Sequence, residues 1–340
     1  MVKYFTIFVL TKPKDTMKKI FVAVVAAMVC TAAMAQDAGQ DAGQEVQQEK
    51  SFFQKFKDWR IRSIESKCDT NYLMITKYAW CAKVSNVSEF NTYKYNLGGG
   101  DRIEGKSGYN NRTIVALFWR GLGVAWSFGM NKNIDRNFSL GLNGNKIGGN
   151  FNWQQNTQDI GTGTPANFNH LDLNVYYVFN PRKFSINAVT RQHTFIQKKS
   201  AGSFYLTADF NRTVVKNMVT DFDIVMQPVH QFRASLGVGY GYNLSFQQGK
   251  FLLHASYAPN VNLLNVIRQY DANDENGQTI SSGMGLAYGH NATVGGSYDI
   301  KQRVVLGFLA SDRFSLSNDN IPYSISYNYC GVEGFVRVRF

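Results

Sequence analysis

Proline, charged residues and long apolar stretches are all scarce in this chain of 340 residues. Only 6 residues are Pro, and 18% are charged. Beyond residue 35, no stretch reaches the roughly 18 consecutive apolar residues that a membrane-spanning helix needs. A helical membrane protein is therefore excluded for that part of the chain. A globular domain, or a membrane protein that crosses with strands, is still compatible with the composition.

Cysteine is also scarce, and this limits the chemistry. Beyond residue 35 the chain holds Cys68, Cys81 and Cys330, which are too few for a disulfide framework. No CxxC motif or Cys/His cluster occurs, so we expect neither a metal site nor a cofactor. The sequence leaves open whether Cys68 and Cys81 pair in an oxidising compartment.

The N-terminus carries a secretory pattern. A basic start at Met17 precedes the apolar stretch 20–29, and the small-x-small sequence 33–35 ends it. This order is typical of a signal peptide. We therefore interpret residues 1–35 as an N-terminal extension and signal peptide, with either Met1 or Met17 as the start.

The net charge suggests partners outside the cell interior. Residues 1–35 hold five Lys and one Asp, so their removal lowers the formal charge from +12 to +8. This positive charge favours the acidic head groups of lipopolysaccharide and other outer-membrane lipids. An exported protein has little access to nucleic acid, so none is expected as a partner. The oligomeric state is left open.

Two segments separate the signal peptide from the main domain. Residues 36–50 repeat Asp-Ala-Gly-Gln and run into Gln and Glu, which predicts a disordered linker. In residues 51–67, Phe52, Phe56 and Trp59 recur at near-helical spacing between Lys and Arg residues. This spacing predicts a short basic amphipathic helix, which either rests on the membrane or packs on the domain.

From about residue 70 the apolar period changes to two. In 232–246 every second residue is apolar or aromatic, and the residues between them are mostly small or polar. The runs 171–180 and 283–299 alternate in the same way. Strands of soluble sheets usually have about 5–6 residues, whereas strands that cross a membrane need about 9–11. The long alternation therefore favours strands with one face toward lipid and the other toward a lumen.

We predict that residues 68–340 form an all-β, transmembrane, antiparallel up-and-down β-barrel. The candidate segments favour about 12 strands, within a range of 10–14, because single-chain bacterial barrels usually have an even number. Short turns are expected at 247–250 and 300–302 and a long outer loop at 259–281. The predicted location is the outer membrane of a Gram-negative bacterium.

The last strand ends on an aromatic residue. Val336, Val338 and Phe340 alternate with polar or charged residues. A terminal aromatic with apolar residues at alternate positions before it is similar to the signal read by the barrel assembly machinery. We expect these three residues to form that signal.

Four stretches occur in a recognisable order. They are Asp69-Thr70-Asn71-Tyr72; Phe118 to Gly123; Asn180 with Lys183-Phe184-Ser185 and Lys198 to Ser203; and Gly239 to Asn243. Together they resemble the outer-membrane family known as domain of unknown function 4421, over nearly all of the chain beyond residue 35. The resemblance implies a barrel of this size and no known activity, so it brings no catalytic residues.

One pair of residues has the spacing of a catalytic pair. His254 and Ser256 are two residues apart and fall on one face of a predicted strand. Some outer-membrane lipid hydrolases use such a pair, with the His as base for the Ser nucleophile. The alternation here points both side chains into the lumen rather than toward lipid. We therefore expect no enzyme activity, and keep a lipid-modifying hydrolase as the alternative.

The expected function is that of a non-enzymatic barrel with a structural or surface-interaction role or a small pore. Arg233, Arg337 and Arg339 are the predicted lumen charges, and they would bias an open pore toward anions. Either the loop 259–281 or the segment 36–67 could fold inward and plug the lumen. The sequence favours a plugged barrel over an open one without deciding between them.

Overall fold

The structure is a computed structural model. It describes residues 51, 54–55, 58, 62, 68–98, 101–106, 110–129, 136–159, 165–190, 194–216, 228–269, 278–283, 287–316 and 325–340. The predicted signal peptide at 1–35 and linker at 36–50 lie outside these residues. Within 51–67, Gln54, Lys55, Asp58 and Arg62 are helical, and the rest of the expected amphipathic helix is not described, so it stays a prediction.

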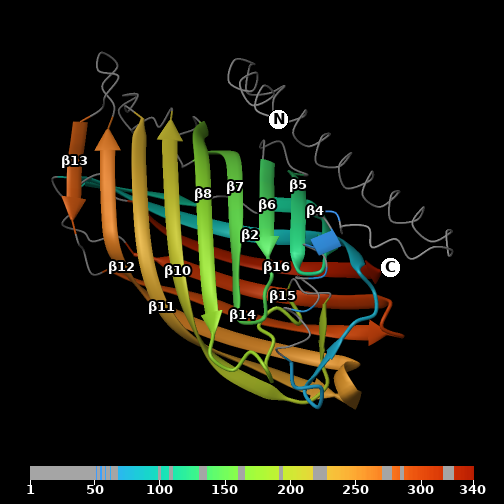
Figure 1. The fold of residues 1–340 in the computed structure, drawn as a ribbon. Helices are drawn as coiled ribbons and strands as arrows, with labels where there is room; N and C mark the ends of the chain where they lie inside the picture. Colours follow the sequence, from blue (N-terminus) through green and yellow to red (C-terminus); the bar gives the residue numbers. More distant parts are fainter. Residues whose placement is uncertain are drawn as a thin grey trace. The chain divides into compact units, whose positions relative to one another are not determined.

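In the described part of the chain, twelve strands form a closed antiparallel ring, which confirms the predicted fold class and strand number. Neighbours in the ring are neighbours in sequence, as in an up-and-down barrel (Figure 1). The ring consists of β2 (Trp80–Gly98), β4 (Asn110–Trp119), β5 (Leu122–Gly129), β6 (Arg136–Leu142), β7 (Ile147–Asp159), β8 (Pro165–Val178), β10 (Ala201–Lys216), β11 (Val229–Phe246), β12 (Phe251–Gln269), β14 (Ala287–Ile300), β15 (Val304–Ser315) and β16 (Ile325–Arg339).

The ring closes between its first and last strands. β16 pairs with β2 from Ile325 opposite Tyr95 to Arg339 opposite Cys81. Two short strands extend the sheet beyond the ring. β3 (Asp101–Lys106) pairs with β2, and β13 (Gln278–Gly283) pairs with β12. A closed ring leaves no unpaired edge, which is the condition for a sheet to cross a membrane.

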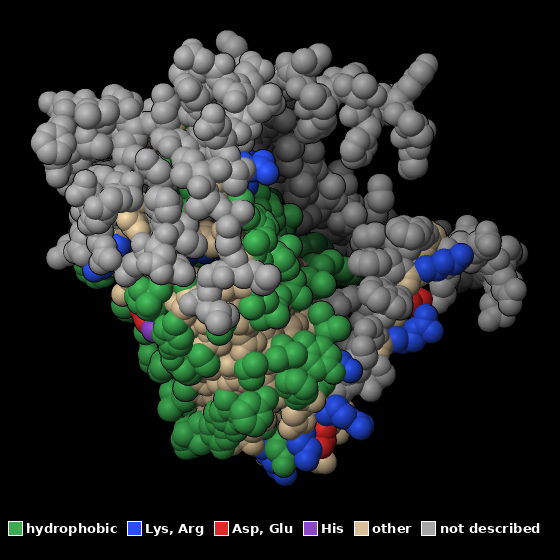
Figure 2. Space-filling view, turned by 90° about the vertical axis from the view of Figure 1, so that its left-hand side faces the viewer, with side chains coloured by type: hydrophobic (Ala, Val, Ile, Leu, Met, Phe, Trp, Pro, Cys, Tyr) green, Lys and Arg blue, Asp and Glu red, His purple; other side chains and the backbone are tan. Residues whose placement is uncertain are grey.

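The outer wall is apolar. On β11, Leu236, Val238 and Tyr240 are exposed while Gly237 and Gly239 between them are buried. The same alternation on other strands gives the wall the apolar cover visible in Figure 2. Exposed apolar residues on this scale indicate a surface that faces lipid. Among the described helical residues, none belongs to a helix long and apolar enough to cross a membrane.

The short connections gather at one end of the barrel, which we assign to the periplasm because bacterial barrels have their short turns there. The β4–β5 turn consists of Arg120 and Gly121, both with positive φ (45° and 87°), the backbone of a tight hairpin turn. Basic side chains occupy the described connections at this end: Arg120, Lys146, Arg182, Lys183, Lys198, Lys199, Lys250, Lys301 and Arg303. We call this set the basic rim; Figure 2 shows Lys and Arg side chains at the lower edge of the molecule.

The predicted outer loop at 259–281 is wrong over 259–269 and over 278–281, where the chain is in strands. β12 continues through Pro259 to Gln269, and β13 covers Gln278–Gly283. Proline lacks a backbone N–H and so cannot donate to the ladder at its position. Pro259 nevertheless sits in register opposite His290. A strand of 19 residues with partners on both sides tolerates the loss of that single donor.

The connection between β8 and β10 turns back into the barrel (Figure 1). Residues 184–190, together with β9 (Phe195–Gln197), form what we call the inner segment. Its side chains at Phe184, Ser185, Val189 and Gln197 are buried. β9 pairs with β1 (Leu73–Ile75), placing Ile196 opposite Met74. The inner segment thus fills the periplasmic end of the lumen.

Candidate functional site

Beyond the inner segment the barrel encloses a cavity of about 440 Å³, which we call the chamber. Ile186, Asn187 and Thr190 of the inner segment form part of its lining. A volume of this size falls within the range of small-molecule sites. The chamber is therefore the candidate functional site.

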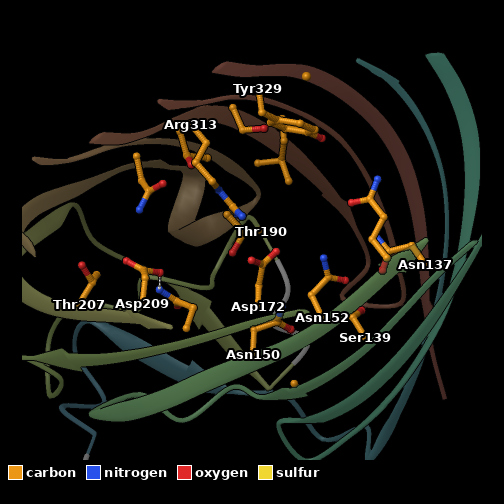
Figure 3. Close-up of a pocket in the computed structure, with 18 of the residues that line it drawn as sticks. Asn137, Ser139, Asn150, Asn152, Asp172, Thr190, Thr207, Asp209, Arg313 and Tyr329 are labelled. Atoms are coloured by element: carbon orange, nitrogen blue, oxygen red, sulfur yellow. Dashed lines mark hydrogen bonds between the residues drawn. The ribbon is translucent and has the colours of Figure 1, made fainter. Parts of the chain in front are cut away.

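Carboxamide side chains are the most frequent lining groups. They come from most strands of the ring because the inward positions of each strand are polar: Asn91, Asn137, Asn143, Asn150, Asn152, Gln154, Asn174, Asn187, Asn211, Asn260, Asn262, Asn291 and Asn328. Each carboxamide both donates and accepts hydrogen bonds. Figure 3 shows Asn137, Asn150 and Asn152 on one wall of the chamber, beside Ser139. Such a lining suits a polar solute.

Two Asp–Asn pairs join β8 and β10. The register sets Asn211 opposite Asp172 and Asn174 opposite Asp209. Asn211 Nδ2 donates to Asp172 Oδ1 over 2.7 Å, and Asn174 Nδ2 donates to Asp209 Oδ1 over 2.5 Å. The two pairs hold two carboxylates side by side on one wall.

Arg313 enters from the opposite wall. It lies on β15, and its side chain lines the chamber together with that of Asp172. Figure 3 shows Arg313 and Asp172 pointing toward one another, with Thr190 of the inner segment near the gap. Within the described residues, no carboxylate lies at ion-pair distance from Arg313.

The other charges that line the chamber are already paired. Lys83 Nζ lies 2.6 Å from Glu333 Oε1. Arg112 Nη2 lies 3.0 Å from Glu89 Oε2, and both of these side chains are buried. Of the charged side chains that line the chamber in the described structure, only Arg313, Asp172 and Asp209 therefore have no ion-pair partner.

The predicted pair His254 and Ser256 points into the lumen, and the structure adds a third member. His254 Nε2 lies 3.1 Å from Ser256 Oγ, and His254 Nδ1 lies 2.7 Å from Asn243 Oδ1. Asn243 Nδ2 already donates to Ser185 O and to Gln197 Oε1. Its oxygen is thus free to accept from Nδ1–H, which leaves Nε2 to accept from the Ser256 hydroxyl.

The three predicted lumen arginines point inward but are engaged with the protein. Arg337 Nη2 donates to Val189 O over 2.6 Å, and Arg339 Nη1 pairs with Asp299 Oδ2 over 2.6 Å. Arg233 Nη1 donates to Ser315 Oγ over 2.6 Å, and its guanidinium lies 4.9 Å from the ring centre of Tyr327. All three side chains are buried. They consolidate the wall and the inner segment instead of facing an open pore.

The predicted absence of a metal site stays a prediction. Among the described residues, no group of three or more His, Cys, Asp or Glu side chains is arranged to hold a metal ion.

Val336, Val338 and Phe340 all lie exposed on the outer face of the last strand or at its end. Their predicted role in assembly is left as a prediction.

The cysteines of the described residues are not bridged. Cys68, Cys81 and Cys330 form no disulfide, so the pairing of Cys68 with Cys81 that the sequence left open does not form. Cys68 precedes β1, outside the ring strands, and burial raises the pKa of its thiol to about 11.

We expect Cys68 to react slowly with thiol reagents. The thiolate is the reactive form, and at pH 8 a pKa of about 11 leaves roughly a hundredfold less thiolate than an ordinary value of 9.0. The rate should rise about tenfold per pH unit up to about pH 10. Maleimide labelling of a folded variant in which Cys68 is the sole cysteine measures this. A fast rate that does not change with pH would contradict the burial of Cys68.

The comparisons with known proteins give one family and several solved structures. The model of the family described as "Domain of unknown function (DUF4421)" matches residues 67–312. No curated protein matches the chain. The outer membrane protease OmpT from Escherichia coli is similar at 11% identity and a TM-score of 0.39, covering 80% of this chain and 100% of that one.

Two further solved structures differ in kind. The COG4313 outer membrane channel from Pseudomonas putida F1 is 10% identical with a TM-score of 0.39, covering 80% of this chain and 99% of that one. The translocator domain of the autotransporter NalP from Neisseria meningitidis is 10% identical with a TM-score of 0.34, covering 84% and 95%. A protease, a channel and a translocator have no activity in common, so these likenesses indicate no particular role.

Proposed function

Since the chain belongs to the family described as a domain of unknown function (DUF4421), its role must be inferred from its own geometry, and we propose a non-enzymatic, plugged outer-membrane barrel that admits a small polar solute to its chamber. The observation that carries this proposal is the inner segment. It occupies the periplasmic end of the lumen, while a cavity of about 440 Å³ lies beyond it. In this proposal the barrel is closed at rest and passes its solute only when the inner segment moves.

The way the inner segment is held supports a movable plug. Single side-chain donors from the wall reach its main-chain carbonyls: Arg337 bonds to Val189 O, and Asn243 bonds to Ser185 O over 2.8 Å. Ala188 and Val189 also pack against a small apolar cluster of the wall. Because no ladder of backbone hydrogen bonds joins residues 184–190 to a ring strand in the described pairings, these contacts can break while the ring stays intact.

Conductance tests the proposal. The purified full chain in a planar bilayer is expected to show no steady conductance, with brief openings at most. A steady current through the unaltered protein would overturn the plugged interpretation. The same proposal includes three further points. Residues 1–35 direct export, and the outer face contacts lipopolysaccharide. The assembly machinery recognises Val336, Val338 and Phe340.

A hydrolase is the second candidate, and the row of Ser256, His254 and Asn243 is the observation that favours it. Such a row is an arrangement for nucleophilic catalysis. Ser256 Oγ would add to the carbonyl carbon of an ester as its proton passes to His254 Nε2. His254 would return that proton to the leaving alcohol, and water would then release the acyl group from Ser256. The hydroxyl of Tyr205, which lines the same chamber, would serve as the donor for the oxyanion.

The position of Ser256 in the lumen argues against the hydrolase, because a lipid ester would have to leave the bilayer to reach Ser256. Labelling with a fluorophosphonate decides between the two candidates. We expect no covalent labelling of the folded wild type. Labelling that is lost in Ser256→Ala but kept in the matched lumen variant Ser235→Ala would establish the hydrolase.

A further inference from the structure

We propose that the chamber binds a small zwitterion, such as a short peptide, with its carboxylate on Arg313 and its ammonium group on Asp172. This inference rests on the proposed function, because the ligand has to reach the chamber. It adds the chemical class of the solute to that function.

The charges of the chamber lead to this class. Lys83 is neutralised by Glu333, and Arg112 by Glu89. What a solute meets is one guanidinium on one wall and the carboxylates of Asp172 and Asp209 on the other. The field across the chamber therefore has a positive and a negative side, and it orients a solute that carries both charges.

The geometry leaves the two charged walls without a direct bond. Arg313 and Asp172 point at each other (Figure 3) but lie beyond ion-pair distance. Asp172 Oδ1 is held by Asn211, which leaves its second oxygen available to an ammonium donor. The guanidinium of Arg313 presents the planar fork that binds a carboxylate through two parallel hydrogen bonds.

Asp209 acts on the ammonium group only indirectly. Its Oδ1 accepts from Asn174, and its Oδ2 is shielded from solvent and makes no hydrogen bond. We therefore assign direct contact with the ammonium group to Asp172 and assign to Asp209 only a strengthening of the negative wall.

Other solute classes fit this arrangement less well. A simple anion would bind Arg313 but face two carboxylates. A neutral sugar could bond to the carboxamides but would bring no opposite charge to Arg313, Asp172 or Asp209. A short peptide satisfies both charged walls, and its amide groups match the carboxamides of the lining, of which Asn150 and Asn152 lie close to Asp172 (Figure 3).

Titration calorimetry with the full chain in detergent micelles tests the class of solute. The probes are alanyl-alanine, its N-acetyl form, its C-terminal amide, and sucrose. We expect alanyl-alanine to bind at least about tenfold more tightly than either blocked form. Sucrose should bind more weakly than all three peptides.

Two variants assign the ends of the ligand. In Arg313→Gln, alanyl-alanine should lose its advantage over the C-terminal amide and keep its advantage over the N-acetyl form. In Asp172→Asn the pattern should be reversed. Arg268→Gln, which removes an exposed arginine that does not line the chamber, should leave all four affinities unchanged.

Equal affinity for all peptide probes, tighter binding of sucrose, or no heat with any probe would overturn the proposal. If a variant lacks the heat-shifted migration of a folded barrel, the four probes on the wild type still decide it. The conductance test of the plug uses no ligand. A closed barrel without zwitterion binding would therefore remove this inference alone, whereas an open barrel would remove the plug.

Discussion

Replacing Phe184 to Thr190 with Gly and Ser residues of the same length is expected to turn the closed barrel into a steadily conducting one. The replacement removes the buried ring of Phe184 and the packing of Val189 on the wall. It also leaves Arg337 with a disordered acceptor in place of Val189 O. Because residues 184–190 pair with no ring strand, the closed sheet keeps its backbone hydrogen bonds.

Single-channel recording in planar bilayers measures this effect. Wild type should remain closed at voltages where the replaced variant carries a steady current. The double variant Arg182→Ser and Lys183→Ser changes exposed residues next to the inner segment and should stay closed. If the replaced variant is folded by heat-shifted migration and still does not conduct, the inner segment is not the barrier.

Glu89→Gln is expected to lower the free energy of unfolding by about 3–5 kcal/mol, because it leaves a buried arginine without its counter-charge. Glu89 is 0% exposed and Arg112 is 6% exposed, and their atoms Oε2 and Nη2 lie 3.0 Å apart. Asn110 Nδ2 donates to the other oxygen of Glu89 over 3.2 Å. The double variant Glu89→Gln with Arg112→Gln should recover much of the loss, since no isolated charge is then buried.

Urea unfolding of the reconstituted barrel, followed by tryptophan fluorescence, gives these energies. Glu333→Gln is the matched control, because its side chain and that of Lys83 keep 17% and 9% of their exposure. Water then screens the remaining charge, so the loss should be clearly smaller. Equal losses in Glu89→Gln and Glu333→Gln would show that burial does not set the strength of these pairs.

The ring could be predicted from sequence because each strand of a closed sheet has one face toward lipid and one toward the lumen. The alternation of 232–246 therefore predicts which residues of β11 face lipid and which face the lumen. Pro259 shows the limit of this reasoning. The outer loop is predicted to begin at this residue because the stretch after it is rich in Asn, Asp and Gly, whereas the long β12 ladder extends past it.

The chamber was only partly predictable. The spacing of His254 and Ser256 gives their common face, but Asn243 joins them through the register of β11 and β12, which depends on the placement of the turn at 247–250. The inner segment was missed, because 36–67 and 259–281 were considered as plugs instead. Phe184, Ile186 and Val189 follow no strand period, and bonds such as that from Arg337 to Val189 O end on a main-chain atom. The available signal was the length of the β8–β10 connection, which is far longer than a periplasmic turn needs.

The basic rim has a consequence for the direction in which the barrel enters its membrane. Carrying an Arg or Lys through the middle of the bilayer opposes insertion by about 2–4 kcal/mol for each side chain, and these charges lie in successive connections at the same end. Several of them also rest over tyrosine rings: Lys146 Nζ lies 5.2 Å from the ring centre of Tyr177, and Lys250 Nζ lies 5.6 Å from that of Tyr298. We therefore expect the rim to stay on the periplasmic side while the opposite ends of the strands cross the membrane. After insertion, the same charges would keep the periplasmic end of the wall out of the hydrocarbon core and so fix the depth of the barrel in the membrane.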